Sequence, residues 1–162
     1  MYPCWDKKGD VIQYKLNANK IATGWQEIDN KWYYFDEKGN MLMDIWLNYN
    51  NNWYYFSESG EMIRDEWKQY NNDWFYCNED GKMLNSVWIK FGDCWFFLDQ
   101  TGKMVKEKWV RYNNNWFYIN KNGRMVMDTY VSNKRKHYYV NNKGELQVEL
   151  RRTKKNKNDS NK

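Results

Sequence analysis

Short hydrophobic runs and polar turns alternate along most of this chain, and the hydrophobic runs are rich in aromatic residues. The stretch from Trp46 to Phe56 shows the pattern, with two apolar runs on either side of an asparagine-rich turn. Two strand-favouring runs around a short turn predict a β-hairpin. Gly60 follows and predicts a second turn with a positive φ angle. The only proline is Pro3, so proline interrupts none of the predicted strands.

The predicted hairpin recurs every 21 residues, and ten of the 11 tryptophans keep this step in two series. The first series is Trp25, Trp46, Trp67, Trp88 and Trp109, and the second is Trp32, Trp53, Trp74, Trp95 and Trp116. Turn glycines keep the same step from Gly39 to Gly144, and so do five methionines from Met41 to Met125. A short fixed period predicts stacked copies of one supersecondary unit. We therefore predict an all-β fold, a β-solenoid of stacked hairpins with 21-residue repeats.

Side-chain alternation along the predicted strands separates two faces. One face varies among apolar types, as a packing core does, in the series Phe35, Phe56, Cys77, Leu98, Ile119, Val140 and the series that begins at Tyr33. Alternation assigns a first-strand series to the same core side, namely Ile28, Tyr49, Tyr70, Phe91 and Tyr112. The opposite face carries both tryptophan series without exception. A core needs volume and no particular ring, so the constant tryptophans predict flat aromatic walls for a ligand.

Three aromatic walls suit a quaternary ammonium ion. Two tryptophans of one hairpin and a tyrosine of the next would form a cage with no charged residue fixed in the repeat. Aromatic faces attract such a cation, and each wall contributes about 0.5–2 kcal/mol. A single cage would bind weakly, with a Kd of about 1 mM, while several cages facing a repeating polymer would gain about 10²–10⁴ from avidity. The alternative is that the tryptophans only pack one hairpin against the next.

The repeat also carries a family resemblance. Gly24-Trp25, Trp32-Tyr33-Tyr34-Phe35, Gly39 and Met41 together resemble the choline-binding (cell-wall-binding) repeat, and the match covers about residues 24–146. Such repeats occur in surface proteins, autolysins and phage lysins associated with Gram-positive bacteria. The resemblance implies a left-handed β-solenoid that holds choline between successive hairpins. It further implies phosphocholine on teichoic acids as the target, a secreted or cell-surface location, and frequent fusion to a catalytic domain.

Five choline cages follow when the family arrangement is carried onto this sequence. Their expected walls are Trp25, Trp32 and Tyr55; Trp46, Trp53 and Tyr76; Trp67, Trp74 and Phe97; Trp88, Trp95 and Tyr118; and Trp109, Trp116 and Tyr139. The third wall of each cage rests on the face assignment and the family pattern. Two roles are open for the methionine of each repeat, namely to fill gaps in the packing or to close a fourth side of the cage. The candidates are Met41, Met62, Met83, Met104 and Met125.

Both ends of the chain depart from the repeat. Residues 1–23 predict a degenerate half-repeat that caps the first hairpin, which Trp5 would cover, and residues 24–129 hold five intact repeats. In residues 130–150 a tyrosine and the only histidine replace the two tryptophans, which predicts a capping repeat. Residues 151–162 hold six of the 26 basic residues and one of the 21 acidic residues, which predicts a disordered basic tail.

Composition excludes several classes of function. The charges balance outside the tail, so no nucleic-acid-binding face is expected. The three cysteines do not follow the repeat and predict no disulfide framework, and no metal or cofactor site is indicated. No signal peptide is visible, and no stretch approaches the ~18 apolar residues of a membrane span.

Three other functions compete with choline binding. Catalysis is not expected, because the acidic residues lie at variable turn positions and a single histidine supports no triad. Carbohydrate binding is the main alternative, since related-looking repeats of glucan-binding proteins and clostridial toxins bind sugars, although those repeats often lack the second tryptophan. A structural spacer would let the tryptophans vary. An end hairpin also offers an exposed edge for a homodimer.

Overall fold

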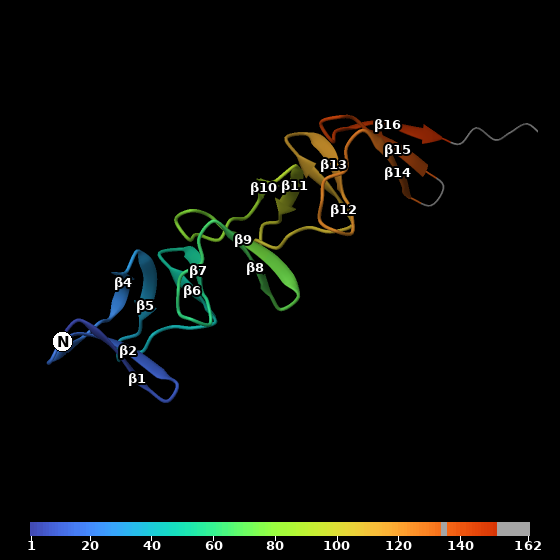
Figure 1. Cartoon of the computed structure of the whole chain (residues 1–162). Coiled ribbons are helices and arrows are strands. Elements are labelled where there is room, and N and C mark those ends of the chain that lie inside the picture. Colours follow the sequence, from blue (N-terminus) through green and yellow to red (C-terminus); the bar gives the residue numbers. More distant parts are fainter. Residues whose placement is uncertain (134–135, 152–162) are drawn as a thin grey trace, which may run out of the picture. The chain divides into compact units, whose positions relative to one another are not determined.

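The structure is a computed structural model that describes residues 1–133 and 136–151, with Asn133 and residues 148–151 described by their backbone alone. Within this part of the chain, every regular element is a β-strand. The chain forms two compact units, which we describe separately (Figure 1): Met1–Leu84, and a second unit that begins at Asn85. The tail predicted for residues 151–162 lies, beyond Arg151, outside the described residues.

The first unit contains a three-stranded antiparallel sheet and three hairpins. The sheet has the order β1 (Cys4–Lys8), β2 (Val11–Asn17), β3 (Lys20–Ile21). The hairpins are β4 (Gly24–Ile28) with β5 (Lys31–Phe35), β6 (Ile45–Tyr49) with β7 (Asn52–Phe56), and β8 (Glu66–Tyr70) with β9 (Asp73–Cys77).

The second unit contains two hairpins and a closing three-stranded sheet. The hairpins are β10 (Val87–Phe91) with β11 (Cys94–Leu98) and β12 (Lys108–Tyr112) with β13 (Asn115–Ile119). The sheet has the order β14 (Thr129–Asn133), β15 (Lys136–Val140), β16 (Leu146–Arg151). The predicted all-β fold of repeated hairpins is therefore confirmed, while its handedness stays a prediction.

Two-residue turns connect the strands of each hairpin. In the hairpin β6–β7, Tyr49 pairs with Asn52, so the turn consists of Asn50 and Asn51, with φ angles of 49° and 61°. Tight hairpin turns of this kind need positive φ at both central residues, and asparagine tolerates that conformation better than most residues. The asparagine-rich segments of the sequence therefore fix the register of the hairpins.

Each 21-residue repeat contributes a fully buried side chain to the core at the same position of the repeat. These are Phe35, Phe56 and Cys77 in the first unit and Leu98, Ile119 and Val140 in the second. This confirms the core series that alternation predicted, with Cys77 as a small buried hydrophobic residue. Burial raises the pKa of the Cys77 thiol to about 12.

The methionines connect successive hairpins within each unit. The Met62 N–H donates a 2.8 Å hydrogen bond to the carbonyl oxygen of Trp32 in the preceding hairpin. Its side chain lies against Gly81 of the following repeat, where an added Cβ would stand 2.6 Å from the Met62 Cε atom. Gly81 also has a φ of +80°. A glycine is thus needed there both for its backbone conformation and for the space it leaves to methionine.

The N-terminal segment forms a full hairpin rather than the expected half-repeat. Trp5 stands opposite Tyr14, just as each first tryptophan of an intact hairpin stands opposite an aromatic residue. The Trp5 ring contacts Tyr33 of the next hairpin at 5.1 Å, so Trp5 covers the first intact hairpin as predicted. The Ile12 carbonyl accepts a hydrogen bond from the Met41 N–H, the role that the second tryptophan has elsewhere. Ile12 therefore replaces the second tryptophan of a repeat that is one residue short.

Candidate functional site

Hairpin register brings the two tryptophans of each repeat together. In β4–β5, Trp25 stands opposite Tyr34, and Trp32 stands opposite Glu27. Residues two positions apart along a strand share one face, so the two indoles are diagonal neighbours on the same face of the ribbon. Their ring centroids lie 6.2 Å apart with an interplanar angle of 74°.

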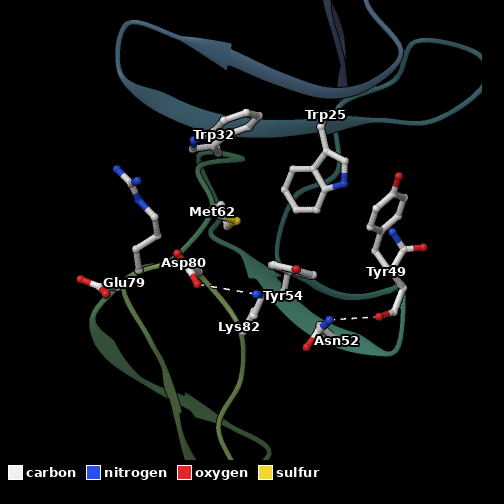
Figure 2. Close-up of a pocket in the computed structure, with 11 residues that line it drawn as sticks. Trp25, Trp32, Tyr49, Asn52, Tyr54, Met62, Glu79, Asp80 and Lys82 are labelled. Carbon is white, nitrogen blue, oxygen red and sulfur yellow. Dashed lines mark hydrogen bonds and ion pairs between the residues drawn. The ribbon is translucent and has the colours of Figure 1, made fainter.

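A cavity of about 660 Å³ lies between this pair and the next hairpin, β6–β7 (Figure 2). Tyr49, at the end of β6, forms a third wall, with its ring 5.7 Å from Trp25 at 81°. Tyr54 of β7 contacts Trp25 at 5.0 Å and lines the cavity beside Met62. The Trp25 ring is therefore nearly perpendicular to the rings on either side of it, which gives an open aromatic cage.

The second unit contains the same arrangement. A cavity of about 460 Å³ is lined by aromatic residues and methionine, namely Trp88, Trp95, Tyr112, Phe117 and Met125. Trp88 and Tyr112 lie 6.3 Å apart at 88°. In the first unit, Trp46 and Tyr70 repeat this geometry at 6.4 Å and 89°. A tyrosine 24 residues after the first tryptophan thus stands nearly perpendicular to it in three repeats, and in two of them it lines a cavity.

The tyrosine that sequence analysis chose as the third wall lies elsewhere. Tyr55 is fully buried and does not line the cavity of Trp25 and Trp32. Its ring lies 5.0 Å from Trp46, because the register places Tyr55 opposite Trp46 in the same hairpin, and its hydroxyl donates a hydrogen bond to Asp44. Burial and that hydrogen bond raise the pKa of Tyr55.

Each of the other members of that series also lies against the residue opposite it in its own hairpin. The ring pairs are Tyr76 with Trp67 at 5.2 Å, Phe97 with Trp88 at 5.0 Å, Tyr118 with Trp109 at 5.2 Å, and Tyr139 with Tyr130 at 5.1 Å. Alternation alone had placed the series that contacts the first tryptophan of the preceding hairpin, Tyr49, Tyr70 and Tyr112, on the core side. The signal that could have found it was its nearly constant aromatic character, since four of its five members are Tyr or Phe.

The candidate methionines separate into three groups. Met62 and Met125 line the two cavities. Met83 repeats the backbone contact of Met62 by donating to the Trp53 carbonyl, and Met104 lies against Gly123. Met41 instead is buried in the core of the first hairpin, because the N-terminal repeat offers isoleucines where a cage would need rings.

As choline sites all five expected cages stay predictions, and the third and fifth differ from the others in what the structure describes. Trp67 and Trp74 lie on β8 and β9 of the first unit, whereas Phe97 lies on β11 of the second. In the last expected cage Trp109 contacts Tyr138 at 5.4 Å, and Trp116 is 44% exposed. In the second expected cage Trp46 has the perpendicular contact with Tyr70 described above. Trp53 of the same cage is 43% exposed.

Charged residues lie at the rim of the cages. Arg64, Glu79, Asp80 and Lys82 line the first cavity, and Lys82 lies 3.6 Å from Asp80. Across the described residues, no group of three His, Cys, Asp or Glu side chains is placed to hold a metal ion. The same residues contain no helix with the length and apolar character needed to cross a membrane. The aromatic walls of the cavities can hold a quaternary ammonium ion through their ring faces and through contacts with its methyl groups.

Comparisons with known proteins agree with this geometry. The choline-binding repeat matches residues 22–67, and the cell wall binding repeat matches residues 65–83, 88–104 and 107–125. No curated protein sequence gives a match.

Solved structures with the same fold include proteins of Streptococcus pneumoniae and a phage endolysin. Choline binding protein F from Streptococcus pneumoniae is similar with a TM-score of 0.70 and 31% identity, over 88% of this chain and 51% of that chain. CbpJ from Streptococcus pneumoniae TIGR4 gives 0.71 and 28%, with the same coverage. A pneumococcal cell wall endolysin from phage Cp-1, complexed with choline, gives 0.55 and 29%, over 88% of this chain and 40% of that chain. The chain thus spans about half the length of choline binding protein F and of CbpJ.

Stacked hairpins with aromatic cages and matching repeats define a repeat protein of the cell-wall-binding class. Within that class, the chain belongs to the choline-binding repeat family.

Proposed function

We propose that this chain is a binding module that holds choline in cages between successive hairpins and so attaches to choline-bearing cell-wall polymers. The observation that carries the proposal is the cage of Trp25, Trp32 and Tyr49, with two nearly perpendicular ring pairs around one cavity. A trimethylammonium group donates no ordinary hydrogen bond, so ring faces and methyl contacts are its natural partners. The same geometry recurs with Trp88 and Tyr112.

Weak individual cages suit attachment to a polymer that repeats its ligand. Each cage binds with a Kd of about 1 mM by the estimate for three walls, and simultaneous occupation of several cages supplies avidity. Because the related structures include a choline binding protein of Streptococcus pneumoniae and a phage endolysin of the pneumococcal cell wall, the module acts at the cell surface of a Gram-positive bacterium or within a phage lysin. Its own role is binding, and any catalysis belongs to another domain.

The test is a titration of the full chain with choline. Binding is monitored by two-dimensional NMR of the tryptophan indole N–H groups and by thermal unfolding. Choline should shift the signals of Trp25 and Trp32 and raise Tm at millimolar concentration, because ligand bound only to the native state stabilises it. Trp32→Ala should abolish the shift of the Trp25 signal. Trp5→Ala is the matched control, since Trp5 is a half-exposed indole of the repeat that lacks a second tryptophan.

Ammonium chloride and glucose oligomers serve as ligand controls. A response to glucose oligomers without a response to choline would move the function to carbohydrate binding. An absence of any indole shift at 100-fold the expected Kd of about 1 mM would leave the tryptophans as packing residues and would overturn the proposal.

A further inference from the structure

A second cavity adjoins the first choline cage. It has a volume of about 320 Å³ and shares three residues with the cage, Trp32, Met62 and Arg64. Its remaining lining is mainly polar, and is formed by Lys31, Ser57, Glu61, Ile63 and Glu66. The aromatic cage therefore opens beside a polar cavity, and the residues at their junction are an indole, a thioether and a guanidinium.

Arg64 is the cation at this junction that is open to a ligand. Its side chain is exposed, and within the described residues it forms neither a hydrogen bond nor an ion pair. The neighbouring cations differ, because Lys31 lies 2.6 Å from Glu61 and Lys82 lies 3.6 Å from Asp80. A guanidinium presents a planar set of donors that matches phosphate oxygens in pairs.

We propose that Arg64 binds a phosphate group attached to the quaternary ammonium ion that the cage holds, so that this site prefers phosphocholine to free choline. The inference rests on the proposed function. Three methyl groups of the ligand face the aromatic walls, and the fourth substituent on nitrogen must leave through the opening. Since Arg64 lines both cavities, a phosphate carried by that substituent meets the guanidinium at the junction.

The sequence series that contains Arg64 makes the cages chemically different. At 21-residue intervals the series reads Met43, Arg64, Asn85, Lys106 and Met127. Met127 lines the cavity of Trp88 and Trp95 in the second unit. A methionine is thus compatible with a cage of this kind, and Arg64→Met copies a residue that the protein already uses at the equivalent position.

The experiment compares choline and phosphocholine on the full chain, cage by cage, through the indole N–H signals. At Trp25 and Trp32, phosphocholine should bind about 1.5- to fivefold more tightly than choline, the range expected for an exposed charge pair. Arg64→Met should weaken phosphocholine and slightly strengthen choline, because a positive charge near the cation disappears. Arg64→Lys should keep part of the preference, since it keeps the charge and loses the planar donors. Sodium chloride at about 0.5 M should reduce the preference by screening.

Glu79 supplies a control of opposite sign. Glu79 lines the cavity of Trp25 and Trp32, and its carboxylate repels a phosphate group. Glu79→Gln should therefore increase the preference for phosphocholine. The signals of Trp88 and Trp95 should keep their ligand ratio in both variants. An unchanged ratio in Arg64→Met, or equal weakening of both ligands, would overturn the inference while choline binding stands. If neither ligand shifts any indole signal, the proposed function itself fails and the inference fails with it.

Discussion

The hydroxyl of Tyr76 donates a 2.5 Å hydrogen bond to the carboxylate of Asp65, eleven residues earlier in the same repeat. Asp65 has a φ of 51° and begins the segment that leads into β8. The same bond joins Tyr139 to Asp128 at 2.8 Å. Where Phe97 replaces the tyrosine, the residue eleven positions earlier is Ser86, so the carboxylate is absent where the hydroxyl is absent. Where it occurs, the pair joins the connecting segment to the second strand of the hairpin.

Removing the hydroxyl should cost stability. Tyr76→Phe is expected to lower the free energy of unfolding by about 1 kcal/mol, the typical net value of one hydrogen bond. Asp65→Ser combined with Tyr76→Phe should recover part of the loss, because this pair already occurs as Ser86 and Phe97. Urea unfolding measures the difference. Tyr34→Phe is the matched control, since the Tyr34 hydroxyl has no hydrogen bond within the described residues. Equal losses in Tyr34→Phe and Tyr76→Phe would contradict the assignment.

The same pair makes stability depend on alkaline pH. Burial, and then the hydrogen bond to Asp65, raise the pKa of Tyr76 to about 12, against an ordinary value of about 10. The folded state therefore favours the neutral phenol, and this stabilisation is complete below pH ~10 and lost as pH rises towards 12. The stability difference between the native protein and Tyr76→Phe should therefore shrink between pH 10 and 12.

A Cys77→Ala background suits that measurement, because the raised pKa of the buried thiol changes stability over an overlapping range. Urea unfolding at several pH values gives the difference, and absorbance of the tyrosinate follows ionisation directly. A difference that stays constant to pH 11 would show that Tyr76 ionises equally easily in both states.

Contact between Gly81 and Met62 couples backbone conformation to the cage. Gly81→Ala strains a φ of +80° and also places a methyl group 2.6 Å from the Met62 Cε atom. Since Met62 lines the first cavity, the substitution should lower stability by about 1–3 kcal/mol and also weaken choline binding at Trp25 and Trp32. Gly92→Ala is the control, because its φ of +58° is similarly strained but no atom lies within 4 Å of the added carbon.

Thermal unfolding and the indole titration separate the two effects. Gly92→Ala should lose stability without a change at Trp25, and Gly81→Ala should lose both. If the two variants weaken choline at Trp25 to the same extent, the contact with Met62 has no part in the cage.

The sequence predicted the fold well and the cage only in part. Its 21-residue step fixed the hairpins, and alternation identified buried residues such as Phe56, because both depend on contacts within one strand pair. The third wall depends instead on how one hairpin is oriented against the next. Alternation put Tyr55 on the tryptophan face and Tyr49 on the core face, whereas the structure buries Tyr55 against Trp46 and leaves Tyr49 39% exposed. No pattern within a single ribbon contains that orientation.

The last repeat distinguishes the two assignments of the third wall. If the third wall is the residue 24 positions after the first tryptophan, that position in the cage of Trp109 and Trp116 is Asn133. Asn133 pairs with Lys136 in the hairpin register, just as Tyr112 pairs with Asn115. Leu146 further replaces the methionine of this cage. With one ring fewer, choline should bind there several-fold more weakly than at Trp88 and Trp95, since each aromatic wall contributes about 0.5–2 kcal/mol.

Asn133→Tyr should restore the missing wall and raise choline affinity at Trp109 and Trp116. Tyr139→Phe should leave that affinity unchanged, because the Tyr139 ring lies against Tyr130 and its hydroxyl binds Asp128. The indole N–H titration measures both variants. Native affinity at Trp109 equal to that at Trp88, together with a loss on Tyr139→Ala that exceeds its effect on stability, would return the third wall to the tyrosine that alternation chose. The third wall of each cage would then come from the second strand of the next hairpin and not from the end of its first strand.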